Sequence, residues 1–123
     1  MQNFESEIEF RELFKERLKQ FALRIIKLFQ GLPKTGEAQI IGKQLLRSGT
    51  SVAANYRAAC RARSGRDFFS KLSIVVEEAD ETLFWLELLL DADIFSKNKL
   101  QPIMTESLEI LKIVSTARKN AKP

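Results

Sequence analysis

The chain has 123 residues, of which 45% are hydrophobic and 29% are charged, with a formal net charge of +4. This balance is typical of a globular protein and argues against wholesale disorder, and the length predicts a single domain over residues 1–123. Histidine is absent, which excludes the usual neutral-pH general base and imidazole metal ligands, and the few prolines and glycines disfavour a β-sandwich or barrel.

The first predicted helix begins at Phe10 and ends near Gly31, with Pro33 just beyond. Its apolar face has the three- and four-residue spacing of one helix side and comprises Leu13, Phe14, Leu18, Phe21, Ile25, Leu28 and Phe29. Thr35 is the expected N-cap of a second helix, whose stripe is Ile41, Leu45, Val52, Tyr56 and Ala59. The stripe keeps its phase across Ser48-Gly49-Thr50-Ser51. One continuous helix is therefore predicted, with small residues that can allow another helix to approach closely.

Ser64 and Gly65 separate the second helix from a third, which is predicted to begin at Asp67. The core face of this third helix comprises Phe68, Leu72, Val75, Ala79, Leu83, Leu86 and Leu90. After a turn at Asp91–Ser96, a fourth helix from about Asn98 carries Leu100, Ile103, Met104, Leu108, Leu111 and Val114. Four amphipathic helices with short connections most simply form an all-α, antiparallel up-down-up-down four-helix bundle.

No segment of the sequence has the pattern of an export signal or a membrane span. The first twelve residues mix acidic and apolar side chains, and the longest apolar stretch, Leu83–Leu90, is interrupted by Glu87. The single Cys60 cannot form an internal disulfide and has no metal-ligand companions, which fits a reducing compartment. A cytoplasmic protein with no membrane contact is expected.

Catalytic apparatus is not recognisable in the sequence. Glu77, Glu78, Asp80 and Glu81 form an acidic cluster, and such carboxylates can hold Mg²⁺ or share a proton. Because they spread around adjacent helical turns, the favoured interpretation is a solvated or ion-paired face, with Glu77, Asp80, Glu81 and Glu87 facing basic residues. No glycine-rich phosphate loop follows a strand pattern. The expectation is a non-enzyme without cofactor or metal.

The charges are segregated along the chain. Residues 34–71 hold eight basic and two acidic residues, whereas residues 72–109 hold two basic and nine acidic residues. On the second helix, basic side chains share an arc of about 80° on the side away from the core stripe. Such an arc is expected of a protein that tracks a phosphate backbone, and equally of an ion-paired subunit interface, and it lacks an aromatic residue to stack bases. The candidate nucleic-acid-binding residues are Lys43, Arg47, Arg57, Arg61, Arg63 and Arg66.

The third helix carries more apolar residues than one core face needs. A helix that is apolar on more than one face is normally buried on more than one face, which predicts self-association. The alternative is that Phe84 and Trp85 pack under loops of the same chain. The candidate subunit-interface residues are Ile74, Phe84, Trp85, Leu88 and Leu89.

Four short motifs between residues 32 and 94 carry a family resemblance. They are Leu32-Pro33-Lys34-Thr35-Gly36-Glu37, the run from Gln44 to Asn55, Arg66-Asp67-Phe68, and Glu77-Glu78-Ala79-Asp80-Glu81. Together they resemble the four-helix bundle proteins encoded in intervening sequences of bacterial 23S ribosomal RNA genes. The resemblance implies an up-down-up-down bundle, a ring-like homopentamer and a basic surface that contacts nucleic acid. Relatives partner a reverse transcriptase and its RNA in diversity-generating retroelements, and no catalytic residues carry over.

One departure from the family pattern lies after Asn55. Many members continue with a segment like Ile-Ala-Glu-Gly, whereas here the run is Tyr56 to Arg61, with basic residues in place of the acid. The departure strengthens the positive stripe and places in doubt any role that depends on the missing Glu. Ser51 and Asn55, four residues apart, are expected to hydrogen-bond rather than to contact a ligand.

Two functional hypotheses follow from the sequence. The leading one is a non-enzymatic homo-oligomer, pentamer first and dimer second, that binds structured RNA alone or together with a protein partner. The alternative is a protein-interaction scaffold, or an accessory subunit of a reverse transcriptase, without nucleic-acid binding of its own.

Overall fold

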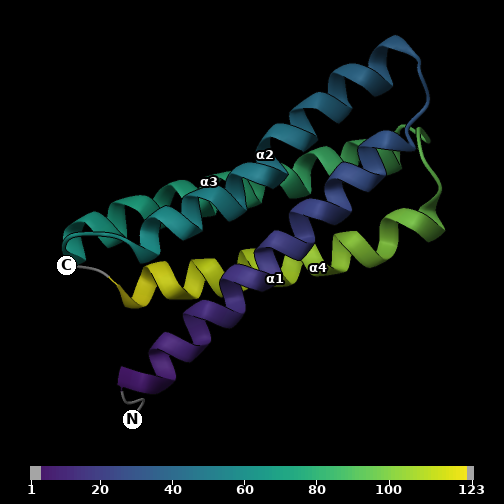
Figure 1. Ribbon diagram of the computed structural model, residues 1–123. Coiled ribbons are helices and arrows are strands. Elements are labelled where there is room, and N and C mark those ends of the chain that lie inside the picture. The colour runs from purple at the N-terminus through teal and green to yellow at the C-terminus, as the bar shows by residue number, and fades with distance from the viewer. Residues whose placement is uncertain (1–3, 122–123) are drawn as a thin grey trace.

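The computed structural model describes the backbone of residues 4–121, and these residues form four helices and no strand (Figure 1). The helices are α1 (Phe4–Gln30), α2 (Gly36–Cys60), α3 (Gly65–Asp91) and α4 (Lys97–Asn120). In Figure 1 the chain turns back at each connection, so that the α1–α2 and α3–α4 connections share one end and the α2–α3 connection lies at the other. The all-α four-helix bundle predicted from the sequence is confirmed. Within the described residues, no helix combines the length and the apolar character needed to cross a membrane.

The helix ends follow the expected signals, with two shifts. Gly31 N–H donates to the carbonyl oxygens of Lys27 and Leu28, which ends α1 where predicted. The Ser64 hydroxyl accepts a hydrogen bond from Asp67 N–H at 3.1 Å and caps α3, which therefore begins at Gly65 and not at Asp67. The first helix begins before Phe10, at Phe4, because the intervening acidic residues suit the positive end of a helix dipole.

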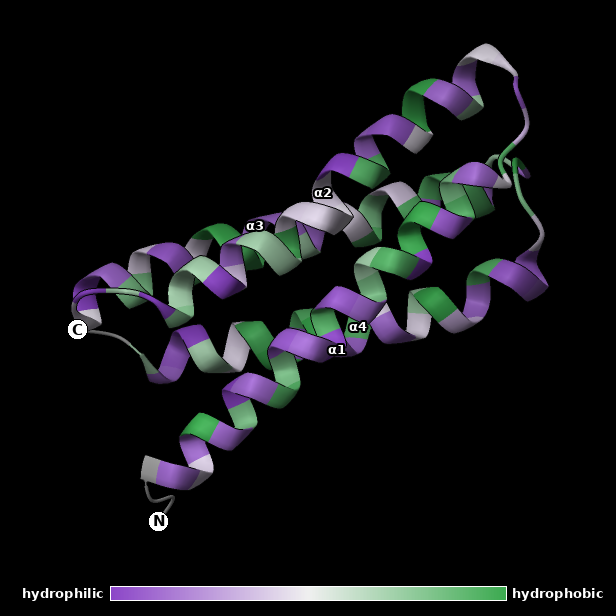
Figure 2. Ribbon diagram, viewed as in Figure 1, coloured by the Kyte–Doolittle hydropathy of each residue, from purple (hydrophilic) through white to green (hydrophobic). Residues whose placement is uncertain are grey.

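The helices bury one apolar stripe each, and Figure 2 shows hydrophobic and hydrophilic bands alternating along every helix. Two predicted core positions are wrong. Leu13 is 73% exposed because it lies on the flank of α1, and Leu108 is 42% exposed because α4 turns Ser107 and Ile110 toward the core. The largest fully buried side chains are Phe21, Leu18, Ile25, Leu45, Leu72, Leu86, Leu89, Leu100 and Ile110.

Two glycines on α2 let α1 pack closely against it. A Cβ atom at Gly49 would lie 3.0 Å from Cγ1 and 3.1 Å from Cγ2 of Ile25, and one at Gly42 would lie 2.9 Å from Cδ1 of Phe29. These separations are shorter than an ordinary carbon–carbon contact. The predicted close approach at the small residues of an unbroken α2 is therefore confirmed.

The two outer helices, α1 and α4, touch over one short stretch and diverge elsewhere. At that stretch the Arg17 guanidinium donates to both carboxylate oxygens of Glu106, at 2.9 and 2.7 Å, and pairs with Glu109 at 2.9 Å. The hydrogen bonds from Arg17 hold the pKa of Glu106 below its usual range. Figure 1 shows the N-terminal part of α1 projecting away from α4. Grooves therefore remain on both sides of the Arg17 bridge.

Candidate nucleic-acid interface

The predicted basic residues of α2 divide into two groups in the structure. Arg57, Arg61, Arg63 and Arg66 follow one another from the end of α2, through the connection, to the first turn of α3, and all four are exposed. Lys43 is also exposed but precedes Arg57 by fourteen residues, or about 21 Å of helix. The structure therefore brings together four of the six candidates, called here the α2–α3 basic surface, and leaves Lys43 apart.

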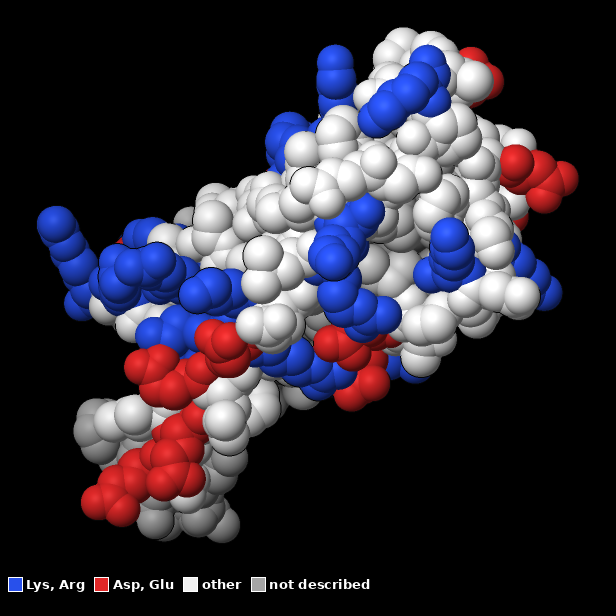
Figure 3. Space-filling model, turned by 45° about the vertical axis from the view of Figure 1, so that its right-hand side comes forward, with Lys and Arg blue, Asp and Glu red and all other residues white. Residues whose placement is uncertain are grey.

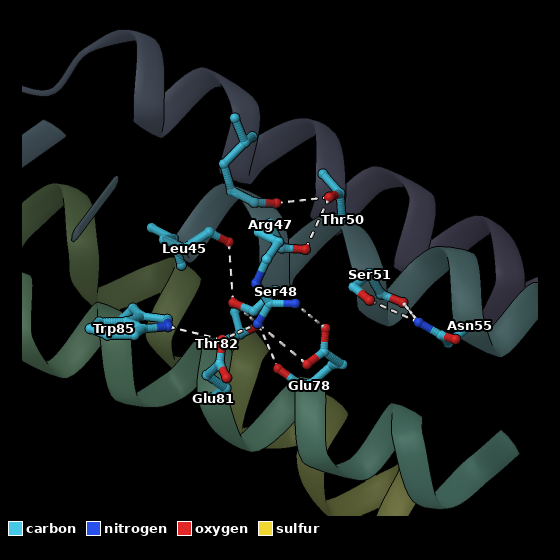
Figure 4. Close-up of polar contacts among 11 residues, drawn as sticks. Leu45, Arg47, Ser48, Thr50, Ser51, Asn55, Glu78, Glu81, Thr82 and Trp85 are labelled. Carbon is cyan, nitrogen blue, oxygen red and sulfur yellow. Dashed lines mark hydrogen bonds and ion pairs between the residues drawn. The ribbon is translucent and has the colours of Figure 1, made fainter. Parts of the chain in front are cut away.

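Arg47 forms ion pairs with acidic residues of the same chain. Its Nη1 donates to Glu78 Oε2 at 2.8 Å, and its Nη2 is paired with Glu81 (Figure 4). The Trp85 indole N–H donates to the same Glu81 carboxylate at 3.2 Å. The hydrogen bonds that Arg47 donates to Glu78 and Glu81 raise the pKa of Arg47 above its ordinary value. Arg47 thus ties α2 to α3, and a phosphate would have to displace two carboxylates to reach it.

The α2–α3 basic surface has no such carboxylate partners. None of its four guanidinium groups forms an ion pair among the residues that the structure describes. Asp67, the nearest acid in sequence, accepts from the backbone N–H of Arg63 and pairs with Lys71 at 2.7 Å, and these contacts hold its pKa below the usual range. A direct ion pair therefore neutralises none of these four charges within the described residues, although Asp67 lies close enough to Arg63 for the two charges to attract.

Basic residues of α4 extend this end of the molecule, and sequence reasoning did not assign them to it. Figure 3 shows Lys and Arg side chains gathered at the end where α2 connects to α3. Arg118 lies against α3, where its Nε donates to the Ser73 hydroxyl at 2.8 Å and its guanidinium stands 4.9 Å from the centre of the Phe69 ring. The order of charges along the sequence marks this tail as basic, but its position beside α3 depends on how the helices pack.

The polar residues of the Gln44–Asn55 motif make contacts inside the bundle. The Asn55 amide donates to the Ser51 carbonyl at 2.9 Å and to the Ser51 hydroxyl at 2.8 Å, so the predicted hydrogen bond is confirmed (Figure 4). Ser48 and Thr82 are fully buried, and the Thr82 hydroxyl donates to the Ser48 hydroxyl at 3.0 Å. The motif thus fixes the contact between α2 and α3 by polar groups and small side chains.

Only some of the acidic residues of α3 form the ion pairs that the sequence predicts. Glu81 pairs with Arg47 as expected, and Glu78, which was not assigned to that arc, is the second partner. Glu77, Asp80 and Glu87 are exposed and form no ion pair with another described residue. Over residues 4–121, no three acidic or cysteine side chains converge as metal ligands would.

Only some of the predicted subunit-interface residues of α3 are exposed and so able to contact another subunit. Ile74 and Phe84 are 43% and 49% exposed, while Trp85 and Leu88 are half-buried. The prediction of Leu89 as an interface residue is wrong, because Leu89 is fully buried in the core next to Leu86 on the inner face of α3. Phe84 and Trp85 contact each other edge to face, with ring centres 5.0 Å apart. An exposed apolar strip remains on the outer side of α3.

The fold and this surface define a class: a small four-helix bundle with a tightly joined α2–α3 pair and a basic end. The chain matches the family described as 23S rRNA-intervening sequence protein over residues 14–116, and it belongs to that family. None of the curated proteins compared with the chain matches it.

One solved structure supports the same assignment. It is the crystal structure of a protein of unknown function from the S23 ribosomal protein family of Bacteroides thetaiotaomicron. The two chains are 38% identical, the likeness covers 89% of this chain and 97% of the other, and the TM-score is 0.81. The relative shares the fold over the part of the chain that the likeness covers.

Proposed function

We propose that this protein is a non-enzymatic homo-oligomer that binds structured RNA through the α2–α3 basic surface. The observation that carries the proposal is the group of four exposed, unpaired guanidinium groups at one end of the bundle. Arginine recognises phosphate oxygens through two parallel hydrogen bonds, so such a group suits a folded phosphate backbone. The family description, which refers to ribosomal RNA, supports RNA as the nucleic acid. Arg47 is left out of the surface, because its guanidinium already binds two carboxylates.

The test rests on counterion release. Replacing Arg57 and Arg61 by Ala removes two phosphate contacts, which should weaken binding to many RNA sequences alike and lower the log–log salt slope by about two. Both side chains are exposed and make no hydrogen bond with another described side chain, so the bundle should stay folded. Fluorescence anisotropy with a labelled RNA hairpin at several salt concentrations measures both quantities.

A matched control separates the surface from net charge. Lys19 and Lys34 are exposed and lie outside the α2–α3 basic surface, so replacing both by Ala removes the same charge elsewhere. This control should keep the salt slope of the parent. Equal losses in the two double variants would refute a localised surface, and a parent that fails to bind RNA at low salt would favour the protein-scaffold alternative.

Self-association is the second part of the proposal. It is supported by exposed Ile74 and Phe84 on α3 and by the family resemblance, from which a pentamer is expected first and a dimer second. Light scattering should give an oligomer at micromolar concentration, and replacing Phe84 by Lys should shift it toward the monomer. A parent that remains monomeric at high micromolar concentration would contradict this part.

A further inference from the structure

One of the two grooves beside the Arg17 bridge lies at the end of the molecule opposite the α2–α3 basic surface. It has a volume of about 440 Å³ and runs between the C-terminal half of α1 and the start of α4. Gly31, in the α1–α2 connection, and Phe95, in the α3–α4 connection, both line it and are close neighbours. The divergence of α1 and α4 beyond the Arg17 bridge leaves this space open.

Three basic side chains and no carboxylate line the groove among the described residues. Arg24 and Lys27 come from α1 and Lys99 comes from α4, and all three are exposed. Glu106, whose pKa is lowered mainly by its hydrogen bonds with Arg17 and also by the charge of Arg24, is already bound by the Arg17 guanidinium. The groove is therefore concave and lined by three cations, and Glu106, the acid that Arg24 attracts, is bound by another partner.

An aromatic ring and aliphatic side chains lie beside these charges. Phe95 is half-buried, and the Lys99 ammonium stands 5.5 Å from the centre of its ring. Because the ammonium lies over this face of the ring, a base that stacks there takes the place of the exposed Lys99 side chain, which can turn to a phosphate. Leu23 is 47% exposed and lines the same groove. A groove near the α2–α3 basic surface also pairs a cation with a ring, Arg11 over Phe68, but carboxylates of Glu7 and Glu109 line it as well.

We propose that this groove binds a nucleotide unit, with the phosphate held by Arg24, Lys27 and Lys99 and the base stacked on Phe95. The combination of a positive groove with a stacking ring is the one that single-stranded nucleic acid requires. The volume falls in the range of small-molecule pockets. The proposal extends the proposed function by adding a site for an unpaired base, and it uses none of the residues of the α2–α3 basic surface.

The first experiment uses adenosine 5′-monophosphate and ribose 5-phosphate as probes that differ by the base. In a titration followed by NMR at low salt, adenosine 5′-monophosphate should shift the Gly31 amide and the Phe95 ring signals in a saturable way. Ribose 5-phosphate should bind about tenfold more weakly, because it lacks the stacking group. Equal affinity for the two probes, or no saturable shift at Gly31 and Phe95, would overturn the proposal.

A steric variant tests the groove without changing its charge. Gly31 is exposed and does not have a positive φ. A Cβ atom there would lie 3.7 Å from Cζ of Phe95 and no closer than 3.6 Å to any atom outside the adjacent residues, so Gly31→Leu should fold and fill the groove. Gly36→Leu adds the same side chain where no atom lies within 4 Å of the Cβ position, and it serves as the control. Gly31→Leu should lose about tenfold in affinity for adenosine 5′-monophosphate and Gly36→Leu should not. Unchanged binding by a folded Gly31→Leu variant would overturn the proposal.

Two further measurements identify the source of the nucleotide and separate this site from the proposed function. A single-stranded RNA of twelve nucleotides should bind more tightly than adenosine 5′-monophosphate and lose affinity in Gly31→Leu. Binding of the mononucleotide but not of this RNA would overturn RNA as its source. The Arg57→Ala/Arg61→Ala variant should bind the mononucleotide as the parent does, because the groove uses neither residue. If the parent binds the mononucleotide but not the RNA hairpin, the proposed function is refuted and the nucleotide site is not.

Discussion

Replacing Gly49 by Ala should destabilise the bundle, although alanine is the better helix former. In an ordinary exposed helix this change gains about 1 kcal/mol. Here the new methyl group would lie 3.0 and 3.1 Å from the two γ-carbons of Ile25, which is fully buried and stiff about χ1 because it is β-branched. Overpacking of this kind costs about 1–3 kcal/mol, so we expect a net loss of about 1 kcal/mol.

Urea unfolding followed by circular dichroism measures this loss. Gly36→Ala is the matched control, because a Cβ atom there meets nothing within 4 Å, and it should leave the stability within about 0.5 kcal/mol or raise it. Gly49→Val should cost more than Gly49→Ala, since it adds two further methyl groups against α1. If Gly49→Ala proves at least as stable as the parent, the close contact with Ile25 does not set the helix spacing and the reasoning fails.

Two other predictions concern polar contacts. Glu106→Gln should cost about 1 kcal/mol of unfolding free energy at pH 7. Arg17 lowers the folded-state pKa of Glu106, so the advantage of the parent is present above the unfolded pKa of about 4.3 and is lost as the pH falls through the lower folded value. In urea unfolding at pH 7 and pH 3, the stabilities of the two proteins should therefore converge in acid. A difference that persists in acid would contradict the ion-pair explanation. Thr82→Val should cost about 1 kcal/mol, because it removes a buried hydroxyl that contacts the Ser48 hydroxyl at 3.0 Å as well as the Glu78 carbonyl oxygen of its own helix at 2.7 Å. Thr105→Val, whose exposed hydroxyl contacts the backbone of its own helix, should cost less than 0.5 kcal/mol. Equal stabilities of the two valine variants in thermal unfolding would show that the Ser48 contact contributes nothing.

The sequence by itself determined the number of the helices and where most of them end. Apolar spacing of three and four residues, together with Gly31 and Ser64 at the ends, is a local property, because each helix satisfies its own backbone hydrogen bonds. The same pattern kept α2 continuous across Gly49, since the stripe from Leu45 to Val52 stays in phase there. The family motif is local as well, and the match over residues 14–116 agrees with it.

Only the tertiary structure decided which charged and apolar groups are available to a ligand or partner. Arg47 and Arg57 look alike in sequence, but α3 brings Glu78 and Glu81 against the first and leaves the second unpaired. Leu89 is a core residue because of the angle at which α3 faces its neighbours, which one helix cannot specify. The groove beside Phe95 exists because α1 and α4 diverge, so it depends on distances between segments that are remote in the chain, and no periodicity within a helix encodes those distances.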